Sequence, residues 1–413
     1  MMLFTPFTLP NGTLIKNRIA KAAMEENLAD ENNLPSNELF NLYGAWAEGG
    51  SGLIISGNVM IDKRAMTGPA GVVLDSEKQL EKFKIWAKIG KSNGAQFWLQ
   101  INHPGRQMPA SLGQKTFAPS AIEMDLGKLS KHFGVPYEMT EADIQDVLSR
   151  FVQTAKLAQQ AGFDGVEIHA AHGYLLSQFL SPKTNQRQDK WGGDLANRAR
   201  LLIEVVKQVR AKVGPSFAVA VKLNSADFQR GGFTTEDAKQ VVKWLNDLNV
   251  DLVELSGGSY EAPVMQGQSR DGQSLAREAY FLEFAKQIRL VANMPLMVTG
   301  GIKRKPVADH VLESNIDLVG LATALALEPN LPNKWQQGDM VTPNLPNITW
   351  KNKVMASLAN MARVKYQLNQ LSKLRAVQPN VHPLWALIKQ QLRDRQRAKL
   401  YRKVMGENRR NNQ

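Results

Sequence analysis

The sequence predicts an α/β fold of the (β/α)8 type, a TIM barrel, and three observations lead to this prediction. Eight short apolar runs of strand length recur between residues 19 and 324, and stretches of helical period separate them. The runs lack a strict alternation of polar and apolar residues, which is typical of parallel strands covered on both faces. The chain of 413 residues is long enough for eight such units. The runs lie at residues 19–24, 52–61, 96–103, 165–171, 217–224, 252–258, 295–301 and 318–324.

The stretches between these runs predict amphipathic helices. The helix after the third run should begin at a capping pair formed by Thr140 and Asp143. Its apolar positions share one helical face and are Ile144, Val147, Phe151, Ala155 and Ala158. A doubly wound open sheet is the competing fold, but no Gly-x-Gly-x-x-Gly motif follows the first run.

Polar residues and glycines gather where the predicted strands end. In a (β/α)8 barrel the carboxyl ends of the strands meet at one rim, and the catalytic residues lie there. A single polar strand end is commonly a solvated loop, but the concentration on one rim predicts a functional site. Gly300 and Gly301 follow the seventh run, where such barrels bind phosphate because glycine lets backbone N–H groups approach the anion.

Composition excludes several classes of protein. The chain has no cysteine, so disulfides, thiolate zinc sites and cysteine-bound iron–sulfur clusters are excluded. The first residues do not form a secretory signal, and no stretch approaches the roughly 20 apolar residues of a membrane span. We therefore expect a cytoplasmic protein.

A pair of histidines follows the fourth run. His169 and His172 are three residues apart, and Tyr174 stands two residues further on. Two imidazoles can hold one carbonyl or anionic oxygen from two directions, and a nearby phenol can donate a proton. A structural His-x-x-His pair or a metal site are the other interpretations of the same residues.

The stretch from Phe163 to Arg200 resembles the signature of the old yellow enzyme family of flavin-dependent ene-reductases. It reads HAAHGYLLSQFLSP and then NQR, GG and NRAR, and Trp191 stands where the family more often has Tyr or Phe. The resemblance covers roughly residues 1–335. Residues 256–285 resemble the subgroup near the flavoprotein part of 2,4-dienoyl-CoA reductases. Those relatives also carry an iron–sulfur cluster and a second nucleotide-binding region, for which this chain lacks the cysteines and the length.

The resemblance implies noncovalently bound FMN, with NADH or NADPH as hydride donor and no metal. It implies that His169 and His172 hold the carbonyl oxygen of the substrate and that Tyr174 donates a proton. Gln100 would contact the flavin pyrimidine edge, and Lys222 falls where an Arg usually lies beside flavin N1. The implied cofactor-binding residues are Ala23, Met24, Glu25, Asn58, Gln100, Lys222, Gly300, Gly301, Ala322 and Thr323.

Three departures from the family pattern concern this cofactor site. Ala23 stands in place of a usual Pro, and Glu25 in place of a Thr or Cys that touches the flavin. An ionised carboxylate at that position would oppose flavin reduction. Ala322 and Thr323 stand in place of a Gly-Arg pair at the phosphate, so either Lys303 or Arg304 substitutes for the Arg, or FMN binds more weakly.

The carboxyl-terminal part of the chain is strongly basic. Residues 347–413 contain fifteen Lys and Arg but only two acidic residues, which gives the +13 net charge of the whole protein. We predict a barrel domain over residues 1–346 and a basic helical extension over residues 347–413. Its helices should cover about 354–371 and 384–405. The extension either packs on the barrel with a solvated basic face or binds anionic lipid or nucleic acid; no motif indicates specific nucleic-acid binding.

The predicted function is that of an FMN-dependent NAD(P)H oxidoreductase that reduces activated C=C bonds of α,β-unsaturated carbonyl compounds. Hydride would come from flavin N5 and a proton from Tyr174, while the two histidines stabilise the developing enolate. Two alternatives remain open. One is an oxidoreductase whose acceptor is oxygen or another flavin; the other is a non-redox phosphate-binding barrel that acts as a scaffold. The sequence also leaves association into a homo-oligomer open.

Overall fold

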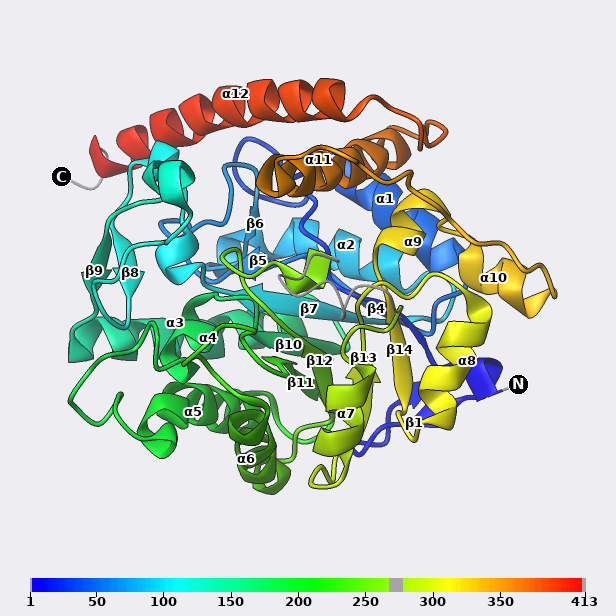
Figure 1. Ribbon diagram of the computed structural model, residues 1–413, viewed down its shortest axis with the longest axis horizontal. Helices are drawn as coiled ribbons and strands as arrows, with labels where there is room; N and C mark the ends of the chain where they lie inside the picture. The colour runs from blue at the N-terminus through cyan, green and yellow to red at the C-terminus, as the bar shows by residue number, and fades with distance from the viewer. Residues whose placement is uncertain (1, 267–277, 411–413) are drawn as a thin grey trace.

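Eight parallel strands close into a barrel in the computed structural model, which describes residues 2–266 and 278–410 (Figure 1). The strand order is β10-β11-β12-β13-β14-β3-β4-β7, and β10 also pairs with β7, which closes the ring. Each of the eight predicted apolar runs supplies one strand of the ring, so the predicted fold is confirmed. The barrel strands are β3 (Ile19–Lys21), β4 (Leu53–Ile55), β7 (Gln96–Asn102), β10 (Gly165–Ala170), β11 (Ala218–Asn224), β12 (Leu252–Ser256), β13 (Leu296–Val298) and β14 (Leu318–Leu321).

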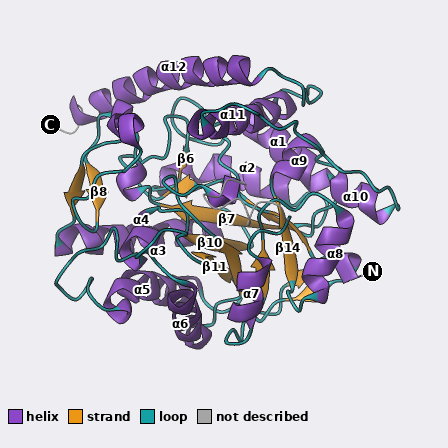
Figure 2. Ribbon diagram, viewed as in Figure 1, coloured by secondary structure: helices purple, strands orange, loops and turns teal. Residues whose placement is uncertain are grey.

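Helices surround this barrel, as Figure 2 shows. They are α1 (Asn37–Glu48), α2 (Leu80–Gly90), α3 (Glu141–Gln160), α4 (Leu175–Leu180), α5 (Leu195–Val213), α6 (Thr235–Leu245), α7 (Leu282–Arg289), α8 (Lys305–Glu313), α9 (Thr323–Leu327) and α10 (Leu331–Gln336). Short strands outside the ring are β1 (Phe7–Thr8), β2 (Leu14–Ile15), β5 (Val59–Met60), β6 (Val72–Val73), β8 (Thr116–Ala118) and β9 (Pro136–Glu138). Residues 267–277 fall within the stretch that resembles the dienoyl-CoA reductase subgroup and lie outside the described residues.

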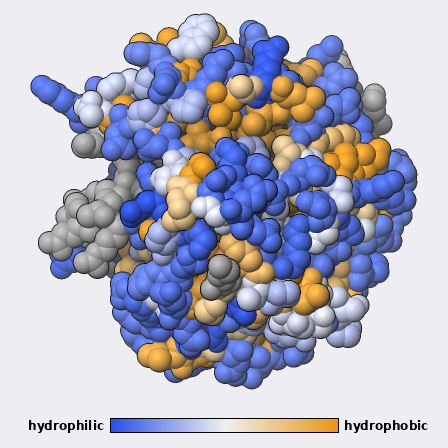
Figure 3. All heavy atoms as spheres, turned by 90° about the vertical axis from the view of Figure 1, so that its right-hand side faces the viewer, coloured by the Kyte–Doolittle hydropathy of each residue, from blue (hydrophilic) through white to orange (hydrophobic). Residues whose placement is uncertain are grey.

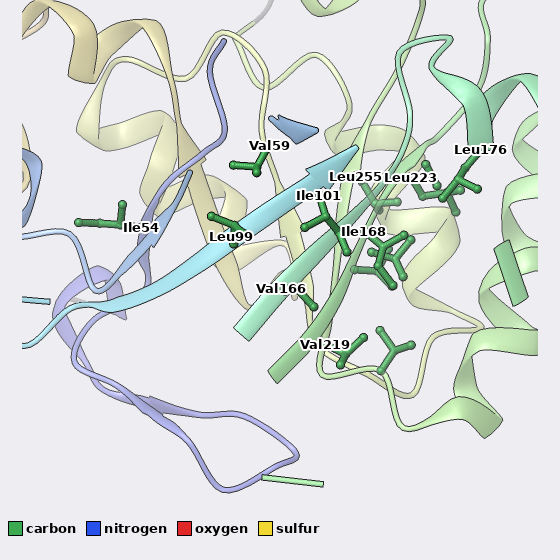
Figure 4. Packing of buried hydrophobic residues seen from close by; sticks show 14 of the residues in the cluster. Ile54, Val59, Leu99, Ile101, Val166, Ile168, Leu176, Val219, Leu223 and Leu255 are labelled. Carbon is green, nitrogen blue, oxygen red and sulfur yellow. The ribbon is translucent and has the colours of Figure 1, made fainter. Parts of the chain in front are cut away.

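Alternate residues of the barrel strands build two separate apolar layers, because successive side chains of a strand point to opposite faces. Ile54, Leu99 and Val166 belong to the layer between the strands and the helices (Figure 4). Leu53 and Trp98, their immediate neighbours, belong to a smaller layer with Leu9 and Ile15 of the β1–β2 region. The apolar runs therefore lack alternation because both faces of each strand are buried.

The helix predicted after the third apolar run is α3. Thr140 and Asp143 form a capping box at its start, and all five predicted apolar positions are buried. The long α5 begins at Asp194, whose side chain accepts a hydrogen bond from the backbone N–H of Asn197. These local signals fix where each crossover begins, and the buried faces fix how it packs on the barrel.

The extension forms the two expected helices, α11 (Lys353–Ser372) and α12 (Pro383–Arg410). Figure 1 shows α12 lying above α11 at the top of the molecule. Asn41 of α1 donates a hydrogen bond to the Ser372 carbonyl oxygen (3.0 Å), and the Tyr401 hydroxyl donates one to the Lys63 carbonyl oxygen (2.6 Å). Both helices thus contact the barrel. Within the described residues, no helix has the length and apolar character needed to cross a membrane.

Candidate active site

A cavity of about 840 Å³ opens at the carboxyl ends of the barrel strands. Most of the residues that the sequence predicts for the site line it, although they come from five different strand ends. These residues are Ala23, Met24, Glu25, His172, Tyr174, Lys222, Gly300, Gly301, Ala322 and Thr323. His169, Gln100 and Asn58 are buried but do not line the cavity. Asn58 instead donates a hydrogen bond to the Thr67 hydroxyl (3.3 Å).

The two histidines are held next to each other by the end of β10. Their ring centroids are 5.0 Å apart. His172 has a left-handed backbone (φ 60°), and its N–H donates to Asn224 Oδ1 (3.0 Å). The Nδ1 atom of His169 accepts a hydrogen bond from the backbone N–H of Ala171 (3.2 Å), so neutral His169 carries its proton on Nε2. His172 Nε2 lies 2.7 Å from the Ser256 hydroxyl oxygen.

Both histidines are neutral at physiological pH. Burial holds the pKa of His169 well below its ordinary value, followed by the repulsion that a second protonated ring at His172 would add and by the charge of Lys222. Burial and Lys222 do the same to the pKa of His172. Among the described residues, no group of three or more His, Cys, Asp or Glu side chains is arranged to hold a metal ion. The pair is therefore suited to hydrogen bonding with a ligand oxygen.

Tyr174 forms a pair with a second tyrosine. Its hydroxyl oxygen lies 3.0 Å from that of Tyr260, and its ring packs edge-on against His169. Burial, together with the neighbouring Tyr260, raises the pKa of Tyr174 well above its ordinary value, so the phenol keeps its proton. Tyr260 also lines the cavity, and an ion pair between Arg106 and Glu261 holds its loop.

Tyr260 was not among the residues predicted from sequence. Tyr260 follows the Gly257-Gly258 turn at the end of the sixth barrel strand, and this place at a strand end could have indicated it as a site residue.

Charged and polar side chains fill the barrel interior beneath the cavity. Gln100 Nε2 donates to Glu167 Oε1 (2.6 Å), and Lys222 Nζ donates to Glu254 Oε1 (2.6 Å). Burial and the charge of Glu254 raise the pKa of Glu167 well above its ordinary value. Burial alone would lower the pKa of Lys222, but Glu254 and Glu167 outweigh it and raise that pKa. Lys222 is therefore a cation whose charge is balanced by Glu254.

The opposite end of the cavity fits a phosphate group. Gly300 and Gly301 adopt positive φ angles (109° and 73°), and a Cβ on Gly301 would lie 2.4 Å from Tyr280 Cζ. In the part of the chain that the structure describes, the backbone amides of Gly300, Gly301 and Ile302 donate no hydrogen bond. Lys303 and Arg304 line the same region, although the Gly-Arg pair usual in the resembling family is missing. Free amides next to two cations are the chemistry that a phosphate needs.

The sequence profile of the NADH:flavin oxidoreductase / NADH oxidase family matches residues 2–341. The chain belongs to this family. It is 40% identical over 352 residues to the NADH-dependent flavin oxidoreductase iliE of Neonectria sp., covering 79% of this chain but 46% of that protein. It is 38% identical to iccE of Talaromyces variabilis (79% and 84% covered) and 34% identical to an NADH oxidase of Thermoanaerobacter brockii (79% and 49% covered).

Two solved structures have the same fold. A 2-naphthoyl-CoA reductase in complex with 2-naphthoyl-CoA superposes with a TM-score of 0.77 at 27% identity, covering 89% of this chain and 58% of that chain. The old yellow enzyme homologue from Zymomonas mobilis gives 0.72 at 25% identity, with 86% and 99% covered. The resemblance to old yellow enzymes is thus confirmed.

The cavity fits the flavin that the family name implies. Neutral hydrogen-bond donors and the paired Lys222 lie at one end, and free amides with Lys303 and Arg304 lie at the other. Helix α11 of the extension forms a further part of the cavity wall. It comes after Thr323 in the chain, the last residue that the sequence predicts for the site. Its lining residues are Ala356, Asn360, Met361, Val364, Lys365 and Leu368.

Proposed function

We propose that this protein is an FMN-dependent NADH or NADPH oxidoreductase that reduces activated C=C bonds of α,β-unsaturated carbonyl compounds. The neutral His169–His172 pair beside the Tyr174–Tyr260 pair carries this proposal, with His172 and both tyrosines on the wall of a cavity that has an anion-binding end. Bound FMN would supply the hydride chemistry, accepting a hydride from the nicotinamide and giving it to the β-carbon of the substrate.

The histidines bind and polarise the substrate carbonyl. His169 offers Nε2–H, because its Nδ1 is engaged by the backbone. A hydroxyl proton donated by Ser256 to His172 Nε2 leaves Nδ1–H of that ring for the ligand. Two neutral donors on one oxygen stabilise the negative charge that develops there as the double bond is reduced.

The tyrosines supply the proton for the α-carbon. Tyr174 lines the cavity and keeps its phenolic proton, as a general acid must. Tyr260 can return a proton to Tyr174, because their oxygens are 3.0 Å apart. The two phenols therefore form a short relay at the cavity wall.

A second candidate function uses oxygen or a free flavin as the electron acceptor. The similarity to the NADH oxidase of Thermoanaerobacter brockii favours it. A third, a phosphate-binding scaffold, would use the anion-binding end alone.

The three functions differ in a simple assay. The ene-reductase should oxidise NADH or NADPH without oxygen when an enone such as 2-cyclohexenone is added, and the saturated ketone should accumulate. Turnover that requires oxygen and leaves the enone unchanged would support the oxidase instead. Protein that takes up FMN or inorganic phosphate but oxidises neither NADH nor NADPH would support the scaffold.

A further inference from the structure

An ion pair joins the barrel to the extension at the cavity wall. Glu25 follows β3, and its Oε2 atom accepts a hydrogen bond from Lys365 Nζ of α11 at 2.6 Å. Both residues line the cavity, and their side chains are only 21% and 17% exposed. The two residues are 340 positions apart in the sequence, so only the docking of α11 brings them together.

The pair is charged rather than neutral. Burial alone would raise the pKa of Glu25, but the Lys365 ammonium outweighs it and that pKa is lowered. Burial alone would lower the pKa of Lys365, but Glu25 and then Asp394 outweigh it and that pKa is raised. Asp394 belongs to α12 and accepts hydrogen bonds from Gln390, so the second helix of the extension supports the same cation.

From these observations we propose that Lys365 is a positioning and potential-setting residue of the flavin site, supplied by the extension to neutralise Glu25. This inference rests on the proposed function. A reduced flavin gains negative charge, and an uncompensated carboxylate on the same cavity wall would oppose that gain. With Lys365 in place, the pair adds no net charge. The carboxylate at position 25 and the cation from α11 thus act as one unit.

The test measures the reduction potential of FMN bound to the full-length protein. Glu25→Gln leaves Lys365 uncompensated and should shift the potential to more positive values. Lys365→Met leaves Glu25 uncompensated and should shift the reduction potential to more negative values. This variant is measured at about pH 9, above the range to which burial raises most carboxyl pKa values, so that Glu25 stays ionised. The double variant and Lys365→Arg should lie near the wild type.

Lys373→Met is the matched control, because Lys373 follows the same helix and lies near Glu38 outside the cavity. An unchanged potential in both Glu25→Gln and Lys365→Met would overturn the inference. If Lys365→Met does not fold, Glu25→Gln alone decides the test. A potential of bound FMN that is not shifted to more positive values in Glu25→Gln would then overturn the inference. A wild type that binds no FMN would instead overturn the proposed function and, with it, this inference.

A separate observation concerns the outer face of α12. Its inner face is buried, with Ala398, Tyr401 and Met405 packed against Met60 and Met108 of the barrel. The first half of the outer face exposes four large apolar side chains, and exposed basic residues lie between and after them on the same face. The apolar residues are Leu384, Trp385, Ile388 and Leu392, and the basic ones include Lys389, Arg395 and Lys399.

This outer face suits one kind of partner. In Figure 3, apolar surface is visible in the upper part of the molecule, the part where Figure 1 places α11 and α12. An apolar stripe with a Trp and neighbouring cations is the composition of helices that lie in the headgroup region of a bilayer. If a second copy of this chain docked here through its own α12, its basic residues would face Arg395 and Lys399, and the two copies would repel each other. We propose that α12 docks on anionic phospholipid surfaces.

Cosedimentation with vesicles tests this docking. The full-length protein should bind vesicles that contain phosphatidylglycerol, bind phosphatidylcholine vesicles weakly, and lose binding at high salt, because exposed charges are screened over about 8 Å at physiological ionic strength. Trp385→Ser and Arg395→Gln should each reduce binding several-fold, whereas Leu290→Ser, a change at an exposed leucine outside α12, should not. Equal binding by Trp385→Ser and the wild type would overturn the proposal. So would self-association without vesicles that depends on Trp385, or binding to nucleic acid in preference to vesicles.

Discussion

The hydroxyl oxygens of Tyr174 and Tyr260 lie 3.0 Å apart, with both side chains on the wall of the cavity. Tyr174→Phe removes the proposed acid, so enone reduction should fall by about 10²–10⁴-fold, the usual contribution of a general acid. Tyr260→Phe removes only the relay and should cost less. Stopped-flow measurement of enone-dependent reoxidation checks both, with the exposed Tyr137→Phe as control. Equal rates in wild type and Tyr174→Phe would contradict the assigned role.

The neutral histidine pair should bind phenolates, which resemble the enolate that the site stabilises. His172→Ala should weaken binding of a para-substituted phenol by about 1.5–3 kcal/mol, the scale of a hydrogen bond to a charged group. Titration of the long-wavelength charge-transfer band measures this affinity, and the exposed His132→Ala is the control. A chelator that abolishes activity would argue for a metal at the pair instead.

The same titration tests the charge of the pair. The pKa values of His169 and His172 are held well below the ordinary value, so neither ring should titrate near pH 6.5, the ordinary midpoint of an imidazole. The affinity for a phenol that is already fully ionised should therefore not change around pH 6.5. A loss of affinity as pH rises through 6.5 would mean that an imidazolium binds the phenolate.

Glu167 should make stability depend on pH. Its pKa is raised in the folded protein, so between the unfolded value and the folded value the native state binds more protons than the unfolded chain. Stability should consequently fall as pH rises through that window. Glu167→Gln retains an oxygen acceptor for Gln100 and removes the titration, so its unfolding free energy should fall less with pH. Denaturant unfolding at several pH values measures the two slopes, and equal slopes would contradict the raised pKa.

The phosphate end can be tested through its cations. Arg304→Ala should weaken FMN binding by about 1.5–3 kcal/mol, and more strongly at low salt, because it removes a cation near the free amides of the Gly300–Gly301 loop. It also leaves Glu278, the ion-pair partner of Arg304 on the cavity wall, without its cation. Lys305→Ala is the matched control, since Lys305 is also paired with a carboxylate, that of Asp309, but does not line the cavity. FMN fluorescence quenching reports the affinity. Equal losses in the two variants would show that Arg304 acts only through general charge.

The sequence predicted the barrel and much of its rim for a physical reason. Strands buried on both faces leave continuous apolar runs, and the residues just after them must lie at one rim, so Lys222 and Gly300 could be placed from local pattern alone. Glu167 and Glu254 were not singled out, because a single carboxylate inside an apolar run shows no sign of pointing into the barrel. Lys365 was missed because its place depends on how α11 docks, and the sequence contains no local signal for a contact with Glu25.

The most direct test of the central claim is an anaerobic redox titration of the purified protein. It should contain FMN or take it up, lose the visible flavin absorbance when NADH or NADPH is added, and regain it when 2-cyclohexenone is added without oxygen. One equivalent of saturated ketone should form per flavin. A reduced flavin that stays reduced with the enone and recovers only in oxygen would contradict the account.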